Sequence, residues 1–286
     1  MQTMWLWMTV GSALLLGFYD VFKKQALRRN GVLWILLGAT ALSTLFLCPF
    51  MSAGTLREHL IIAFKAVLVT TSWVSGMIGL KLLPITTVST LKASRPFFVV
   101  LFSILLFGER LNAWQWGGVV LALLALWLLS RSSKQEGITF AKSKGVAAIA
   151  VSILSGVASA LYDKHIISGM EPLFLQFWAN FYITVLLAIC LGVKALHDGD
   201  ARERFHWDWT IVVIAVFITG ADMLYFFSLK QPGALLSVIS LIRRSSVIVP
   251  FAAGALLFKE RRIKEKAIDL AILLAGMVLL LYGSSQ

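Results

Sequence analysis

Long blocks of apolar residues recur along this chain, and they restrict its fold more than any other feature. We predict about ten membrane-spanning helices, over residues 4–22, 32–51, 60–80, 84–107, 113–130, 145–167, 173–194, 210–229, 233–258 and 265–283. A helix needs about 20 apolar residues to cross the hydrocarbon core of a bilayer. Only 14% of the 286 residues are charged, against roughly 25% in soluble domains. The sequence therefore predicts an all-α integral membrane protein.

A polar segment near the middle of the chain divides these helices into two sets of five. We predict a first repeat over 1–130, a polar linker over 131–144 and a second repeat over 145–286. Similar motifs close equivalent helices of the two halves: Phe18-Tyr19-Asp20 and Leu161-Tyr162-Asp163, then Phe107-Gly108-Glu109-Arg110 and Phe258-Lys259-Glu260-Arg261. Because each set has an odd number of helices, the second enters the membrane upside down. Inverted repeats of this kind build many secondary transporters.

Lysine and arginine are distributed unevenly between the predicted loops. The loops after the odd-numbered helices carry most of them, including Lys23 and Lys266, whereas the opposite loops carry few, Lys65 among them. The positive-inside rule then places the basic loops in the cytoplasm and both termini outside. Basic loops beside anionic lipid also account for most of the net charge of +12 without a nucleic acid partner.

Four basic residues fall inside the predicted spans, where charge is costly. Lys92 and Arg95 lie three residues apart in the fourth helix, hence on nearly one face, and Arg243 and Arg244 lie in the ninth. A charge at the bilayer centre costs roughly 2.5–3.5 kcal/mol on insertion scales, so such residues normally face a wet cavity or a partner. When the two repeats are aligned, Arg243 falls at the position equivalent to Lys92.

Asp222 in the eighth helix is the acid of comparable depth, so the buried cations outnumber it. A small anionic cargo is the simplest source of the missing counter-charge, because arginine and lysine both suit phosphate or carboxylate. Other readings stay open. Arg95 and Arg244 could brace the bundle, and Asp222 could pair with the arginines or couple transport to protons. Tyr225 could offer its hydroxyl to the cargo or mark the membrane interface.

Other polar residues near these spans have simpler explanations. A polar stripe on the third helix, which includes Ser72 and Ser75, could line a cavity or bond its own backbone. Asp20 and Asp163 lie beside basic residues, so we expect local ion pairs. Glu109 and Glu260 close their helices and read as structural hinges or topology markers.

The sequence contains no pattern typical of a metal site or of an enzyme active site. Cys48 and Cys190 lie far apart inside apolar blocks and lack the spacing of a metal site or a disulfide framework. No nucleophile and base lie at matched depth, and no Gly-rich phosphate loop follows a strand pattern. We therefore expect no cofactor, no metal and no enzymatic activity.

Three stretches of the first half carry further motifs: Gly79-Leu80-Lys81-Leu82-Leu83-Pro84, Thr90-Leu91-Lys92-Ala93-Ser94-Arg95-Pro96-Phe97-Phe98 and Phe107-Gly108-Glu109-Arg110. These stretches resemble the drug/metabolite transporter superfamily (EamA-like), and more narrowly its triose-phosphate and nucleotide-sugar translocator branch. The resemblance implies that Lys92 and the pair Arg243-Arg244 clamp the phosphate of a cargo and that Tyr225 contributes. It also implies a polar residue on the third helix, for which Ser75 is the candidate.

Together these features predict a secondary transporter of a small organic anion, most simply a phosphorylated metabolite such as a sugar phosphate. It would work by alternating access and anion exchange, and would lie in contact with lipid in a bacterial cytoplasmic membrane, with a homodimer left open. Two other classes remain: a proton-coupled exporter of amino acids or drugs, and a lipid-phosphate flippase or non-transporting membrane protein.

Overall fold

The computed structural model describes residues 4–95, 97–98, 112–134, 138–166, 170–197, 205–231, 239, 242–258, 260 and 262–284. Within these ranges the α-helices are α1 (Met4–Ala26), α2 (Val32–Leu47), α3 (Leu56–Leu82), α4 (Ile85–Ala93), α6 (Ala113–Lys134), α7 (Lys144–Ile166), α8 (Pro172–His197), α9 (Trp209–Lys230), α11 (Ile248–Leu256) and α12 (Ile263–Ser284). Short 3-10 segments are η1 (Cys48–Phe50), η2 (Phe140–Lys142) and η5 (Ser245–Val247). The motif Phe107 to Arg110, with Glu109, lies outside the described residues, as do Lys259 and Arg261.

The all-α membrane prediction is confirmed for the part of the chain that the structure describes. Seven of its helices are long and apolar enough to cross a membrane, and they are α1, α2 with η1, α3, α6, α7, α8 and α9. Large apolar side chains point outward, as lipid contact requires: on α6, Val120 and Leu123 are 60% and 63% exposed. The described parts of α4, α11 and α12 are not among the seven, so the expected ten spans exceed what these helices establish.

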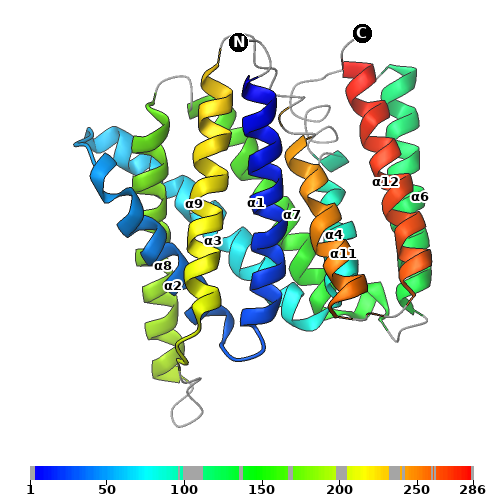
Figure 1. Ribbon diagram of the computed structural model, residues 1–286, viewed down its shortest axis with the longest axis horizontal. Coiled ribbons are helices and arrows are strands. Elements are labelled where there is room, and N and C mark those ends of the chain that lie inside the picture. Colours follow the sequence, from blue (N-terminus) through cyan, green and yellow to red (C-terminus); the bar gives the residue numbers. More distant parts are fainter. Residues whose placement is uncertain are drawn as a thin grey trace.

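Helices from the two halves of the chain pack against each other throughout the bundle. α1 packs along α9 and α3 along α7, while α2 packs on α8, α4 on α11 and α6 on α12. In Figure 1, α6 and α12 stand together at one edge, and α2 and α8 lie toward the opposite edge. The start of α1 and the end of α12 lie at the same end of the bundle. The halves are therefore interleaved, and any cavity at the centre is lined by both.

Local signals explain where several helices begin. Thr55 and Glu58 form a capping box at the start of α3, in which each side chain bonds the other residue's backbone N–H. Asp208 caps α9 by accepting a hydrogen bond from the N–H of Thr210 at 2.9 Å. Both use the side-chain acceptors that satisfy the free N–H groups of a first helical turn.

The fourth and ninth predicted helices are interrupted beside their basic residues, which corrects the expectation of continuous helices over 84–107 and 233–258. α4 ends at Ala93, and its cap Ser94 donates its hydroxyl to the Leu91 carbonyl at 2.6 Å. In the second half, the 3-10 segment η5 separates Arg244 from α11. Proline follows shortly after each interruption in the sequence, at Pro96 and Pro250. Proline lacks a backbone N–H and crowds the preceding turn, which breaks regular helix.

Candidate functional site

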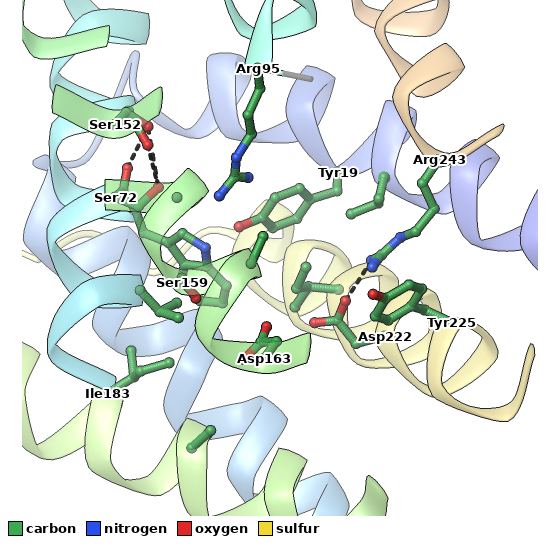
Figure 2. Close-up of a pocket in the computed structure, with 18 of the residues that line it drawn as sticks. Tyr19, Ser72, Arg95, Ser152, Ser159, Asp163, Ile183, Asp222, Tyr225 and Arg243 are labelled. Atoms are coloured by element: carbon green, nitrogen blue, oxygen red, sulfur yellow. Dashed lines mark hydrogen bonds and ion pairs between the residues drawn. The ribbon is translucent and has the colours of Figure 1, made fainter. Parts of the chain in front are cut away.

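A cavity of about 350 Å³ lies at the centre of the bundle, between helices of both halves. Its walls come from α1, α3, α4, α7, α8 and α9, together with the segment that leads into α11. Figure 2 shows Arg95 reaching into it from one side and Arg243 from another, with Tyr19 between them. The volume is in the range of pockets that hold small molecules.

The cavity is lined by more basic than acidic side chains. The basic residues are Lys23, Lys65, Lys92, Arg95, Arg243 and Arg244, and the acids are Asp20, Asp163 and Asp222. The described lining therefore carries six positive and three negative groups, an excess of three positive charges. Such an excess in an apolar bundle is costly unless water or an anion compensates it.

Two of the acids form ion pairs with lysines. Asp20 accepts a hydrogen bond from Lys23 at 2.8 Å, and its carboxylate lies 3.9 Å from the Lys92 ammonium. Asp163 on α7 forms a close ion pair with Lys65 of α3. The end of α1 meets the end of α3, where Lys24 donates to the Leu83 carbonyl at 2.7 Å. The expected local ion pair is thus present at Asp20, whereas Asp163 pairs with a lysine of another helix and not with a neighbour in sequence.

The third acid forms a compact group with an arginine and a tyrosine. Arg243 donates from Nη2 to the Asp222 carboxylate at 2.6 Å, and its guanidinium lies 4.0 Å from the ring centroid of Tyr225. Figure 2 shows these three side chains together on one side of the cavity. Asp222 therefore neutralises Arg243, as its reading as a counter-ion requires. Tyr225 supports the guanidinium with its ring face.

Arg95 and Arg244 are the cavity cations for which the described residues offer no carboxylate within ion-pair distance. The Arg95 guanidinium lies directly over Gly156 of α7, where a β-carbon would collide with its Nη2 and Cζ atoms. The Nε atom of Arg95 is buried and has no hydrogen-bond acceptor among the described residues. These two arginines are the cations most in need of a negative partner.

Neutral polar groups cover other parts of the lining. The hydroxyls of Ser72 and Ser152 bond across α3 and α7, Ser72 to the Ser152 carbonyl at 2.8 Å and Ser152 to the Ser72 carbonyl at 2.6 Å. Ser159 and, from α8, Gln176 and Asn180 add further polar side chains. Neutral hydrogen-bonding groups thus lie among the charged ones, with the Ser152 hydroxyl and the Lys92 ammonium both close to Gly76.

The structure brings most of the residues predicted from sequence to this cavity and leaves one out. Lys92, Arg95, Arg243, Arg244, Tyr225 and Asp222 all line it. Ser75 does not, because its hydroxyl turns back to the Thr71 carbonyl of its own helix at 2.5 Å. In this turn of α3, the residues that face the cavity are Ser72, Trp73 and Gly76.

The sequence analysis did not predict that several polar side chains are buried in or near the cavity. Lys23, Lys65 and Lys266 were assigned to loops, yet they are only 6%, 7% and 0% exposed. Lys23 and Lys65 line the cavity, and Lys266 donates to the Thr86 hydroxyl at 3.2 Å. The position of Lys65 within the third apolar block was a usable signal. Gln176 carried none, because a lone glutamine near a helix start has many explanations.

Comparison with known proteins shows which proteins this chain resembles. Residues 3–131 match the model of the EamA-like transporter family. A search of curated proteins found no match. A solved structure described as a crystal structure of a protein has a similar fold, with a TM-score of 0.63, 14% sequence identity and coverage of 94% of both chains. The chain is therefore a multi-pass, all-helical membrane protein whose first half is similar to the EamA-like transporters of the drug/metabolite transporter superfamily.

Proposed function

We propose that this protein is a secondary transporter of a small organic anion, most simply a phosphorylated metabolite, which binds in the central cavity. The observation that carries the proposal is the excess of three positive charges in the described lining. Arg95 and Arg244 supply cations that form no ion pair with a carboxylate of the described residues. Phosphate and carboxylate groups match guanidinium and ammonium donors in geometry and in charge.

Interrupted helices beside the basic residues support a transport site. α4 ends one residue after Lys92, and η5 begins one residue after Arg244. Substrate sites of secondary transporters are commonly built from helices broken near the middle of the membrane. Broken helices free backbone groups to face a cavity and let the two parts of a helix move separately.

The order of helix packing supports an inverted repeat, which we propose over 1–130 and 145–286 with a linker between them. If α1, α2, α3, α4 and α6 correspond to α7, α8, α9, α11 and α12, then most packing pairs should have an equivalent, and the pair of α4 with α12 is an exception. The contact of α1 with α9 corresponds to that of α7 with α3, and the contact of α2 with α9 to that of α8 with α3. The pairs α2–α8, α4–α11 and α6–α12 are their own equivalents. Alternating access by rocking of the two repeats follows from this arrangement.

A proton-coupled exporter that uses Asp222 is the second candidate. Asp222 already serves Arg243 as counter-ion at 2.6 Å, so its protonation would leave that arginine unpaired. This geometry favours the counter-ion role and therefore the anion carrier. A bacterial cytoplasmic membrane remains the predicted location.

Transport by purified protein in liposomes tests the proposal. Vesicles are loaded with inorganic phosphate, and uptake of labelled phosphate, glycerol 3-phosphate, glucose 6-phosphate or phosphoenolpyruvate is measured. Lys92→Gln and Arg243→Gln should abolish uptake while leaving protein abundance nearly unchanged. Lys142→Gln is the matched control, because Lys142 is exposed and is not one of the residues that line the cavity. Normal uptake by either cavity variant would show that these cations do not bind cargo.

A further inference from the structure

Three buried polar atoms of the cavity lining have no hydrogen-bond partner among the described residues. They are Nε of Arg95, Nε of Arg243 and Oε1 of Gln176. The first two are donors, whereas the third is an acceptor. Buried polar groups in folded proteins are almost always paired, so each unpaired group needs an explanation. A bound molecule with an acceptor at one end and a donor at the other would satisfy all three.

The donors and the acceptor come from different elements. Arg95 lies just after α4 and Arg243 just before η5, and α4 and η5 pack on each other. Gln176 belongs to α8, which packs on α2, α3 and α9. A molecule that fills the cavity can therefore contact both the arginines and Gln176 of α8.

The neighbours of Gln176 fix which way its amide points. Its Nε2 donates to the Thr219 carbonyl at 3.4 Å, and the side chain is only 4% exposed. Thr219 is held in turn, because its hydroxyl bonds the Ala215 carbonyl at 2.7 Å and the Ser43 hydroxyl at 2.6 Å. Exchanging the amide oxygen and nitrogen would set two oxygens against each other at Thr219. The oxygen of Gln176 is therefore the atom that remains unpaired.

We propose that Gln176 determines specificity by accepting a hydrogen bond from a hydroxyl group of the cargo, while the anionic group of the same cargo binds the arginines. This inference rests on the proposed anion transport and narrows the cargo to hydroxylated organic anions. An ammonium group could also donate to Gln176, but the excess of positive charge in the lining disfavours a cationic end. A hydroxyl supplies the donor without added charge.

The experiment compares two phosphate monoesters that differ in their hydroxyl groups. Glycerol 3-phosphate carries two hydroxyls on its carbon chain, and propyl phosphate carries none. Their dissociation constants are measured on the purified protein by calorimetry, with inorganic phosphate as the common anionic core. We expect glycerol 3-phosphate to bind at least about fivefold more tightly, the effect of one net hydrogen bond.

Two variants locate the origin of that ratio. Gln176→Leu keeps a similar side-chain volume but removes the acceptor. In this variant the dissociation constant of propyl phosphate divided by that of glycerol 3-phosphate should fall to about one. Ser152→Ala is the matched control, because the Ser152 hydroxyl already bonds the Ser72 carbonyl, so both ligands should change together and keep the ratio. Gln176→Met replaces Gln176→Leu if the leucine variant does not fold. The ratio of the two dissociation constants in the unchanged protein is a test that requires no variant.

The outcomes separate this inference from the proposed function. Equal binding of the two esters by the unchanged protein would overturn the role of Gln176 while leaving anion binding in place. A preference for glycerol 3-phosphate that survives both Gln176→Leu and Gln176→Met would overturn it as well. Failure of all three phosphate compounds to bind would instead contradict the proposed function on which it rests.

Discussion

The position of the Arg95 side chain depends on Gly156, which has no side chain to block it. Its guanidinium occupies the space where any residue other than glycine at position 156 would place a β-carbon. The sequence alone revealed Arg95 as a buried cation but gave no sign of Gly156, because a glycine inside a helix has many uses. Which residues of α7 lie opposite Arg95 depends on how the helices pack, and a pattern along one chain does not specify that.

Gly156→Ala should therefore displace the Arg95 guanidinium and weaken anion binding about tenfold, because a misplaced cation loses its contact with the cargo. The affinity for inorganic phosphate or a phosphate ester, measured by calorimetry, checks this. Gly192→Ala is the matched control, since a β-carbon there meets nothing within 4 Å. Unchanged affinity in Gly156→Ala would separate Arg95 from the binding site.

The pair of Asp222 and Arg243 permits a test of the counter-ion role. Asp222→Asn and Arg243→Gln should each lower the melting temperature, because each leaves one charge of a partly buried pair uncompensated. The double variant should be less destabilised than the sum of the two, by about 1 kcal/mol or more. Additive effects on the free energy of unfolding would show that the two groups do not interact energetically.

At the scale of elements, the interruptions of the fourth and ninth helices are the main departure from the sequence expectation. Apolar length predicted both as continuous spans, because hydrophobicity reports depth in the membrane and not backbone regularity. Pro96 and Pro250 were the signals that predict a break. The long helices α1, α3 and α8, by contrast, follow their apolar blocks closely, since each needs only its own sequence to satisfy its backbone.

Glu260 illustrates how one element is fixed by another. Its carboxylate accepts hydrogen bonds from the N–H of Ile85 at 2.7 Å and from the N–H and hydroxyl of Thr86 at 3.0 and 2.5 Å. These contacts cap the start of α4 from the segment that follows α11. The sequence reading of Glu260 as a structural residue fits this cap, whereas Glu109 lies outside the described residues.

Glu260→Gln should lower stability by about 1–2 kcal/mol, because it removes a charged acceptor from a helix start. Thermal unfolding in detergent measures the change. Glu265→Gln is the control, since Glu265 pairs with Arg262 at 2.8 Å on the surface and should cost less than about 1 kcal/mol. Equal melting temperatures for the two variants would remove the capping role.

At the scale of the whole molecule, interleaving of the two halves creates a site that neither half contains. The sequence predicted the class of protein and four of the six cations in the described lining. It missed Lys65, Lys23 and Gln176, because their place in the cavity depends on pairings such as α3 with α7 and α8 with α9. Periodicity predicts helices, whereas contacts between distant helices depend on side-chain packing.

The excess of positive charge predicts how the carrier cycles. A cavity with three uncompensated cations should not close empty, so release of labelled anion from loaded vesicles should require an anion on the other side. We expect efflux into anion-free, electroneutral medium to be at least about tenfold slower than exchange against external phosphate. Equal rates in the two media would mean that the empty carrier returns freely and that exchange is not obligatory.

Binding of anions to the purified protein tests the central claim most directly. A ligand that binds only the folded state raises its apparent stability, by about 2.7 kcal/mol at a hundred times its dissociation constant. Melting temperatures are measured with phosphate, sugar phosphates, phosphoenolpyruvate, nucleotide sugars and dicarboxylates. The account predicts stabilisation by at least one phosphorylated anion that is lost in Lys92→Gln and retained in Lys142→Gln. Indifference to every anion, with stabilisation by a cationic or neutral solute, would contradict it and make the arginines structural.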